Sequence, residues 1–412
     1  MTNAKPLVIV GASYAGVQIA ASARELGFAE RIVIVGEEVH APYQRPPLSK
    51  GMLTGKTTID QLPLRGPDFF EQNEIELLLG RRAEVMDVGG RTVRLDDGAT
   101  LEYSWLALAT GARCRSFTLP GSKLEGVFNL RTLDDALRVA DAADRAQRAC
   151  VIGGGFIGLE VASALHSRGV DVTVIEAQPR LLMRSLPTRM AAYVEHAHRL
   201  RGTDLLTGRG VRALHGEQGR VASVELDDGM RIDCDLVVLG IGVQPNAEMA
   251  QQAGIAIDNG IVVDMLGRTS APHVLAAGDV ANMALPAAPG APARMRFESI
   301  QAANDGAKAA ASLMVGCAQP CVAVPWFWSD QFNLKFQMAG LPLPGDDVVL
   351  RGDMATDRFS VFYLRDGTLV AAHSVNKPSE HMQSRKLIGA RAQFTAYQLA
   401  DESFDLKKSG AH

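Results

Sequence analysis

The pattern of apolar and polar positions repeats one arrangement twice along the chain. An uninterrupted apolar run, Leu7–Val10, precedes a turn of small residues and an apolar-patterned helix predicted over residues 15–26. A second such run ends at Val151–Ile152 and also precedes a turn and a helix. Apolar runs without polar alternation are typical of strands buried on both faces of a parallel sheet. The pattern therefore predicts two doubly wound α/β domains.

The first turn has the composition of a phosphate-binding corner between a strand and a helix. Its glycines allow a tight turn and a close approach of helix to strand, and the helix N-terminus directs N–H groups at a pyrophosphate. The candidate contacts are Gly11, Ser13, Tyr14, Ala15 and Gly16. Ser13 stands where the usual pattern has glycine. Glu37, after a strand predicted over 32–35, is a candidate for binding ribose hydroxyls, with a solvated loop acid as the alternative.

The second turn matches the dinucleotide pattern in full. Its candidate contacts are Gly153, Gly155, Ile157 and Gly158. The following predicted strand ends at Glu176, whose carboxylate would accept hydrogen bonds from a free 2′-hydroxyl and repel a 2′-phosphate, which favours NADH over NADPH. Arg180 and Arg184 lie just beyond and have the opposite tendency. We therefore predict two Rossmann-type dinucleotide-binding domains.

Further candidate residues lie in loops and at strand ends. The loop over 41–51 is stiffened by prolines and places Arg45 and Lys50 beside a phosphate-bearing ligand, although a stiff surface loop has the same composition. Buried strands predicted to end at Thr110–Gly111 and at Gly242 bring backbone close to a ligand. Asp279 ends the apolar run HVLAAGD, where it could hold the ribityl hydroxyls of a flavin; a simple turn aspartate is the alternative.

The order of these stretches predicts that one nucleotide-binding domain interrupts the other, because strand-and-turn patterns of the first kind return after residue 242. Past Cys321 the composition shifts to alternating strands with aromatic residues, followed by helices predicted near 379–387 and 391–399. This segment is predicted to form a third, α+β domain. Trp326 and Trp328 share one side of a strand by period two, with core or interface packing as the simplest role.

Composition excludes several classes of protein. The 412 residues carry a net charge of −4, which gives no indication of nucleic-acid binding or of a polybasic membrane patch. We find no signal peptide and no apolar run of membrane-spanning length, and we expect a cytoplasmic protein. The five cysteines are odd in number and mostly scattered, which is typical of a reduced protein, and they do not predict a metal site.

Taken together, the motifs resemble those of the FAD-dependent NADH–ferredoxin reductases of bacterial oxygenase systems. The resemblance spans nearly the whole chain in family order, and PPLSK and PWFWSDQ are its most specific parts. The matching stretches are VIVGASYAG, PYQRPPLSKG, LALATGA, LRTLDDA, VIGGGFIGLEVA, VIEAQPRLLMR, LGIGVQPN, AAGDVA, FESIQAAN and PWFWSDQ.

The resemblance implies a glutathione-reductase-like fold. It implies an FAD domain over 1–112 and 243–320, an NAD domain over 113–242 and a C-terminal interface domain over 321–412. In the matched positions, Gly11, Ala15, Gly16 and Glu37 would contact the adenosine half of FAD. The rest of FAD would meet Lys50, Ala83, Arg131, Asp279 and Ile300. Trp328 would lie at the flavin edge that faces the electron acceptor.

The resemblance also implies a mechanism, in which flavin accepts hydride from NADH and passes single electrons to a [2Fe–2S] ferredoxin that feeds a cytochrome P450 or a Rieske oxygenase. Lys50 would stabilise the anionic reduced flavin. Glu160 would orient the nicotinamide or Lys50, unless it is simply a helix-surface glutamate. We expect a monomer or weak homodimer. The candidate docking residues for the ferredoxin are Arg65, Trp328, Lys335, Arg385 and Lys386.

Other flavoprotein chemistries are weighed against this one. A disulfide reductase needs two neighbouring cysteines after the first strand–loop unit, and an NADH peroxidase needs one; residues 38–60 contain none, and the first cysteine is Cys114. We therefore reject both. A rubredoxin reductase, an NADH oxidase and a redox-gated binding protein of the apoptosis-inducing-factor type remain as alternatives.

Overall fold

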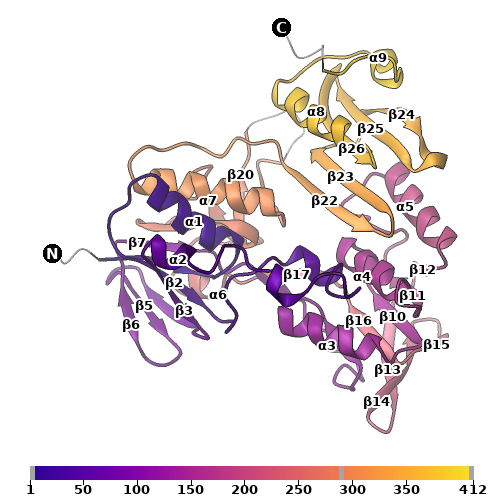
Figure 1. The fold of residues 1–412 in the computed structure, drawn as a ribbon, viewed down its shortest axis with the longest axis horizontal. Helices are drawn as coiled ribbons and strands as arrows, with labels where there is room; N and C mark the ends of the chain where they lie inside the picture. Colours follow the sequence, from indigo (N-terminus) through magenta and orange to yellow (C-terminus); the bar gives the residue numbers. More distant parts are fainter. Residues whose placement is uncertain (1–4, 287–291, 408–412) are drawn as a thin grey trace.

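The computed structural model describes residues 5–286 and 292–407, which form three units (Figure 1). We call residues up to 112 together with 243–320 the first unit, residues 113–242 the inserted unit, and residues from 321 the third unit. Each unit is built around its own five-stranded sheet. Figure 1 shows the first unit on the left, the inserted unit on the lower right and the third unit above it.

The central sheet of the first unit is parallel and has the order β19-β7-β1-β2-β3. All four residues of β1 are buried, as the unbroken apolar run predicts. The helices α1 and α7 pack against each other on one side of the sheet (Figure 1). The elements of this layer are β1 (Leu7–Val10), α1 (Tyr14–Glu25), β2 (Ile32–Gly36), β3 (Ile75–Leu79), β7 (Trp105–Leu108), β19 (Val274–Ala276) and α7 (Ile300–Met314).

Smaller elements complete the first unit. Two three-stranded sheets have the orders β4-β5-β6 and β18-β20-β21. Their strands are β4 (Ala83–Asp87), β5 (Thr92–Leu95), β6 (Thr100–Glu102), β18 (Ile261–Val263), β20 (Ala281–Ala284) and β21 (Arg294–Arg296). The short helices are α2 (Phe69–Gln72) and α6 (Glu248–Gln252), with 3₁₀ turns at η1 (Pro46–Ser49), η2 (Ile59–Gln61) and η3 (Gly278–Val280).

The inserted unit repeats the same sheet, in the order β12-β11-β10-β16-β9. A second, antiparallel sheet has the order β13-β14-β15. The elements are β9 (Val127–Asn129), α3 (Leu133–Ala143), β10 (Arg148–Ile152), α4 (Phe156–His166), β11 (Asp171–Glu176), α5 (Thr188–Leu200), β12 (Asp204–Thr207), β13 (Val211–Glu217), β14 (Arg220–Leu226), β15 (Arg231–Asp233) and β16 (Leu236–Leu239). The sequence pattern over 133–148 is helix-like throughout, but α3 ends at Ala143, because the backbone at Gln147–Arg148 donates to the Asp235 carboxylate and enters β10.

The two chain crossings between these units run side by side. Strand β8 (Ala112–Cys114) leaves the first unit, and β17 (Val243–Pro245) returns to it. They pair in antiparallel fashion, with Gln244 opposite Arg113. Asn246 adds side-chain and backbone hydrogen bonds to Thr110 on the first-unit side. The inserted unit is therefore attached through one two-stranded ribbon.

The third unit is an antiparallel sheet in the order β22-β23-β26-β25-β24, with two helices. Its elements are β22 (Trp326–Gln331), β23 (Leu334–Gly340), β24 (Asp347–Asp353), η4 (Met354–Thr356), β25 (Arg358–Arg365), β26 (Thr368–Val375), α8 (Pro378–Gly389) and α9 (Ala396–Ala400). The last helix begins five residues later than the sequence pattern predicts. Residues 392–394 bond instead to the β25–β26 turn, through Leu369 and Gly367, and Thr395 caps the helix.

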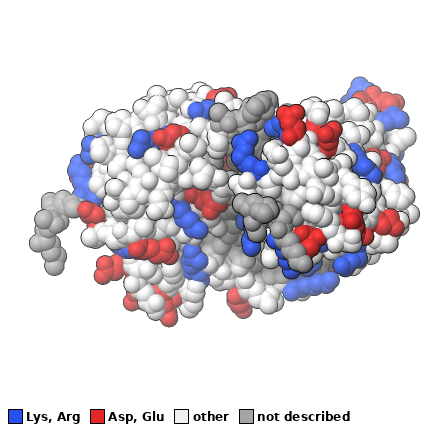
Figure 2. All heavy atoms as spheres, turned by 90° about the horizontal axis from the view of Figure 1, so that it is seen from above, with Lys and Arg blue, Asp and Glu red and all other residues white. Residues whose placement is uncertain are grey.

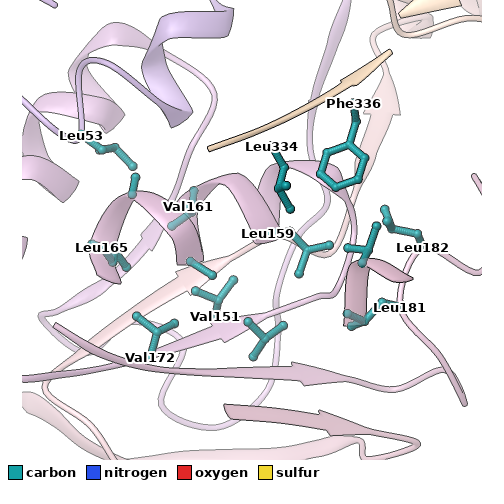
Figure 3. Close-up of a cluster of buried hydrophobic side chains, with 14 of the residues drawn as sticks. Leu53, Val151, Leu159, Val161, Leu165, Val172, Leu181, Leu182, Leu334 and Phe336 are labelled. Atoms are coloured by element: carbon teal, nitrogen blue, oxygen red, sulfur yellow. The ribbon is translucent and has the colours of Figure 1, made fainter. Parts of the chain in front are cut away.

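A single apolar cluster joins the three units around α4 (Figure 3). Leu53 reaches it from the first unit and Leu334 and Phe336 from the third, and all three are fully buried. Leu159 and Leu165 of α4 lie between them. Complete burial of each such side chain contributes about 1.5–3 kcal/mol, so the cluster holds α4 against the first and third units. No helix in the described part of the chain combines the length and apolar character needed to cross a bilayer.

Candidate functional site

One large cavity lies where the three units meet. Its volume is about 1160 Å³, and both glycine turns line it. The first unit adds the loop over 45–50, the inserted unit adds the start of α4, and the third unit adds Phe327 and Trp328 of β22. Ligands bound at the two turns would therefore share one space.

The first turn holds its shape through glycine. Gly11 has a φ of +122°, and a Cβ there would lie 2.0 Å from the carbonyl oxygen of Ala109, just past the neighbouring strand β7. Gly16 packs against the Gly11 carbonyl, where a Cβ would lie at 1.9 Å. Ser13 precedes α1 with no side-chain cap bond among the described residues, and it lines the cavity with Tyr14. Burial raises the pKa of Tyr14 to about 12, so its hydroxyl stays protonated.

The second turn has the same geometry. Gly153 has a φ of +115°, and its Cβ would lie 2.3 Å from the carbonyl oxygen of Gly240. Gly158 packs against the Gly153 carbonyl as Gly16 does against Gly11. A Cβ at Gly155 would meet no atom within 4 Å. Gly155 also lines the cavity, so the space beside it is open to a ligand.

Glu176 is tied to the second turn. Its carboxylate accepts hydrogen bonds from the backbone N–H of Gly154 and of Gln178, each at 2.7 Å. Arg180 bonds to backbone carbonyls of its own loop, and Arg184 lies near Gly242. The carboxylate is therefore held at the end of β11, beside the helix N-terminus that faces the cavity.

Charged residues of the first unit and Arg131 of the inserted unit form linked pairs at the end of the cavity near the first turn. Arg45 donates to Glu38 at 2.6 Å and to the carbonyl of Arg131 at 2.7 Å. Arg131 donates to Asp279 at 2.9 Å. Glu37 is exposed at the rim and has no such partner among the described residues, whereas its neighbour Glu38 also accepts from Tyr43. Ile300, Thr110 and Gly111 line the same end.

Lys50 and Glu160 meet in the wall of the cavity. The Lys50 ammonium lies 2.7 Å from Glu160, whose side chain is 3% exposed. Ser49 donates to the same carboxylate oxygen at 2.5 Å, and Ser329 donates to the other oxygen at 2.6 Å. Glu160 is therefore a buried, fully bonded partner of Lys50 and not a helix-surface glutamate. The pair places one cation, with its charge balanced, at the junction of the three units.

An aromatic stack leads from the cavity along the third unit. Trp328 lines the cavity and stacks on Trp326, with ring centroids 5.7 Å apart and planes at 30°. The guanidinium of Arg385 lies 4.3 Å from the Trp326 ring centroid. The three side chains thus form a continuous column, with half-buried rings at the cavity end.

The structure brings most of the expected site residues to the cavity, but not all. Gly16 and Gly158 lie behind their turns, where they pack the helix against the strand. Ala83 lies on β4 and is outside the lining. Arg65 is also outside it; its side chain donates to Gln18 and lies over the ring of Phe69.

Sequence reasoning missed three residues of the site. Ser49, Ser329 and Gln331 surround Glu160 or support its partners. All three lie inside the stretches PPLSK and PWFWSDQ. Because residues 329 and 331 alternate with the two tryptophans, the period of a strand places them on the opposite, buried face. That signal was present in the sequence.

The cavity offers little for thiol or metal chemistry. Among the described residues that line it, Cys114 is the one cysteine, and burial raises the pKa of its thiol, which disfavours the reactive thiolate. No group of three or more His, Cys, Asp or Glu side chains within residues 5–286 and 292–407 is arranged to hold a metal ion.

Comparison with known proteins identifies the relatives of this chain. Residues 5–307 match the family described as pyridine nucleotide-disulphide oxidoreductase, and residues 326–409 match the family described as reductase C-terminal. Rhodocoxin reductase of Rhodococcus erythropolis is 41% identical over 401 residues, which cover 97% of this chain and 93% of that protein.

Two solved structures share the whole fold. The ferredoxin reductase for the CYP199A2 system from Rhodopseudomonas palustris superimposes with a TM-score of 0.95 at 39% identity, covering 99% of this chain and 100% of that chain. The covalent putidaredoxin reductase–putidaredoxin complex matches with a TM-score of 0.94 at 37% identity, covering 100% of both chains.

Proposed function

Because the chain belongs to the pyridine nucleotide-disulphide oxidoreductase family and is a close homologue of its ferredoxin reductases, we propose that it passes electrons from NADH through FAD to a [2Fe–2S] ferredoxin. Such reductases use FAD and a nicotinamide dinucleotide. The downstream enzyme is proposed to be a cytochrome P450 or a Rieske oxygenase.

One observation carries this proposal: both dinucleotide turns line a single cavity, and Lys50, paired with Glu160, lines the same cavity. FAD, when bound, would supply the conversion of a two-electron hydride donor to single-electron transfers. We assign FAD to the turn of the first unit, with Arg131 and Asp279 near its middle. We assign NADH to the turn of the inserted unit.

Lys50 is proposed to stabilise the negative charge that develops on the flavin ring. Its ammonium bonds to Glu160 at 2.7 Å and approaches the Pro46 carbonyl at 3.4 Å, and its side chain is 20% exposed in the cavity. A cation with a free N–H in a partly dehydrated site interacts more strongly with developing charge than it would in water. Glu160 would hold that cation in place.

The preference for NADH over NADPH is proposed to rest on Glu176. The carboxylate is anchored by two backbone N–H groups, so it cannot easily turn away from a 2′-phosphate. The nearby Arg209 forms an ion pair with Asp228. Its charge is thus partly neutralised, which limits its attraction for a phosphate.

The ferredoxin is proposed to dock over β22 and β23. In their antiparallel pairing, Trp328 lies opposite Gln337 and Asp330 opposite Lys335, so Trp328 and the exposed Lys335 share one face. Arg385 of α8 adds positive charge over the Trp326 ring, and Lys386 is the next residue of the same helix. Arg65 lies apart on the first unit and is a weaker candidate. Figure 2 shows basic and acidic side chains interspersed over the face viewed there, so recognition would depend on a few placed cations.

The decisive experiment measures NADH consumption by the FAD-loaded protein in air, with and without a [2Fe–2S] ferredoxin and with cytochrome c as final acceptor. Strong stimulation by the ferredoxin is expected, with little turnover on oxygen alone. Rapid oxygen consumption without ferredoxin would indicate an NADH oxidase. Reduction of the flavin by NADH without turnover on either acceptor would indicate a different acceptor, such as rubredoxin, or a redox-gated binding protein.

A pair of charge reversals tests the docking face. Lys335→Glu should raise the KM for ferredoxin about threefold to tenfold at low salt and leave turnover with ferricyanide unchanged. Lys123→Glu, at an exposed lysine of the inserted unit, is the matched control and should alter neither. Equal effects of the two variants, or ferredoxin kinetics that are independent of salt, would contradict this face.

A further inference from the structure

A chain of buried hydrogen bonds runs from the cavity into the junction of the inserted and third units. Ser329 donates to Glu160 at 2.6 Å, and the Gln331 amide donates to the Ser329 oxygen at 3.1 Å. The Nε2 of His198, on α5, lies 2.9 Å from the Gln331 carbonyl oxygen. Ser329, Gln331 and His198 are each fully buried.

The direction of every bond in this chain is fixed. A carboxylate only accepts, so Ser329 must donate its proton to Glu160. The Gln331 NH₂ group then faces the Ser329 oxygen, and its carbonyl faces His198. His198 must therefore carry its proton on Nε2.

The neutral state of His198 maintains this assignment of donors and acceptors. Its Nδ1 is buried and has no hydrogen-bond partner among the described residues. Burial is the main cause that lowers the pKa of His198 to about 4; the hydrogen bond to Gln331 opposes this shift, and the charges of Arg201 and His166 add to it. At neutral pH the ring is therefore a single-proton donor toward Gln331.

We propose that Ser329, oriented by Gln331 and His198, is a positioning residue that holds the Glu160 carboxylate against Lys50. The proposal rests on the assignment of FAD to this cavity, but not on the identity of the electron acceptor. It gives the third unit a role in the redox centre itself. Strand β22 presents Trp326 and Trp328 on one face and places Ser329 and Gln331 on the other, so one strand serves both the proposed docking face and the Lys50–Glu160 pair.

The physical reason is the cost of an unsatisfied buried carboxylate oxygen. Without the Ser329 hydroxyl, one oxygen of Glu160 would have no donor, because Ser49 and Lys50 both bond to the other oxygen. The carboxylate would then turn toward Lys50 and compete for its remaining N–H groups. Less of the Lys50 charge would be directed at the cavity.

The test compares Ser329→Ala with Ser374→Ala. Ser374 is equally buried in the same sheet, and its hydroxyl bonds to Ser360 away from the cavity, so it is the matched control. Three quantities are measured: FAD content, the midpoint potential of bound FAD by dithionite titration, and the rate constant of flavin reduction by NADH in a stopped-flow instrument.

Ser329→Ala should retain FAD, shift the midpoint potential to a more negative value and reduce the rate constant about tenfold, the size expected for one hydrogen bond to a charged group. Gln331→Met should have the same direction and a smaller size, about threefold. Ser374→Ala should leave both quantities unchanged.

A double mutant separates positioning from general destabilisation. In a Glu160→Gln background, Ser329→Ala should cause no further change in potential, because the group through which it acts has lost its charge. A full additional effect in that background, or equal potentials for Ser329→Ala and Ser374→Ala, would overturn the proposal. Failure of the wild-type protein to bind FAD would instead overturn the proposed function.

Discussion

The two glycine turns share a backbone and differ in the residues around it. In each, a first glycine with positive φ lies against the carbonyl of the residue just past a neighbouring strand, and a last glycine packs against the carbonyl of the first. The first turn, however, has Ala12 and Ser13 where the second has Gly154 and Gly155. The shared positions are dictated by close packing, and the variable ones face the cavity or the second strand.

The acid after each turn also stands at a different position. The N–H of Gly11 bonds to Val35, and the N–H of Gly153 bonds to Ile175, so Gly36 is the counterpart of Glu176. A Cβ at Gly36 would lie 2.6 Å from the Cβ of Ala12. In the first turn, the methyl group of Ala12 thus occupies the space that a side chain at position 36 would need. Its acids follow one and two residues later, at Glu37 and Glu38, which shows that similar motifs do not place equivalent side chains.

The largest expected effect comes from substitution of the glycines that the two turns share. Gly153→Ala should reduce kcat/KM for NADH with ferricyanide at least about 100-fold, equivalent to about 2.7 kcal/mol, because its Cβ overlaps the Gly240 carbonyl. FAD content should stay near one per chain. Gly11→Ala should do the reverse and yield protein largely without FAD, measured by flavin absorbance. Loss of FAD from Gly153→Ala would show that the turns are not independent.

Substitution of the acid after the second turn should change the preference for NADH over NADPH about tenfold, whereas substitution of the acid after the first turn should not change it. Glu176→Gln removes the carboxylate charge and one of its two acceptor sites, so the preference for NADH over NADPH should fall about tenfold. Glu37→Gln should leave that preference unchanged and weaken FAD retention slightly. Steady-state kinetics with both coenzymes and FAD dissociation by dilution measure these quantities. An unchanged coenzyme preference in Glu176→Gln would contradict its proposed role.

Exchange of the middle residues should have a smaller effect. A side chain at Gly155 meets no protein atom within 4 Å, so Gly155→Ser should fold normally and raise the KM for NADH only about threefold by narrowing the space for the ligand. Ser13→Gly should retain FAD and change the melting temperature by a few degrees at most. An inactive Gly155→Ser with native stability would mean that the second turn tolerates no side chain at all.

Low pH should reveal the smallest difference, which is one of stability between the first unit and the inserted and third units. His198 in the inserted unit and His381 in the third have pKa values lowered to about 4 by burial, below the ordinary value near 6.5. Between these values the unfolded chain binds more protons than the folded one, so stability falls as pH falls from about 6.5 toward 4, by at most about 1.4 kcal/mol per pH unit for each histidine. Because both histidines lie outside the first unit, the inserted and third units should lose stability first. As pH falls, NADH-dependent reduction should therefore decline a few tenths of a pH unit before FAD is released. If NADH-dependent reduction and bound FAD were lost at the same pH, the inserted and third units would not be less stable to acid than the first unit.

The sequence predicts the two nucleotide domains well because their strands are uniformly apolar and their turns are fixed by glycine. The α/β fold with a third α+β domain and the ferredoxin-reductase resemblance are confirmed by the comparisons. Local signals fail where distant residues compete for the backbone. Asp235 ends α3 early, and the turn at Gly367 delays α9.

The site was less accessible to sequence reasoning, because its central contacts join residues far apart in the chain. Nothing in the sequence near Glu160 indicates that Ser49 and Ser329 bond to its two oxygens, at separations of 111 and 169 residues. The composition of the loop predicts the charge of Lys50, but not the carboxylate that balances it. Ala83 carried no local signal for or against cavity contact, and its place on β4 depends on the packing of a separate sheet.

The ribbon formed by β8 and β17 has a consequence for modular exchange. Since the chain leaves and re-enters the first unit at neighbouring strands, the segment between Arg115 and Gly242 begins and ends at one place, and the backbone of these two residues is hydrogen-bonded at 3.0 Å. Such a segment can be replaced as one continuous piece of chain. Transplantation of the corresponding segment from a relative that prefers NADPH would keep both junctions in register and exchange coenzyme choice as one block, provided that the α4 residues packed against Leu53, Leu334 and Phe336 are kept.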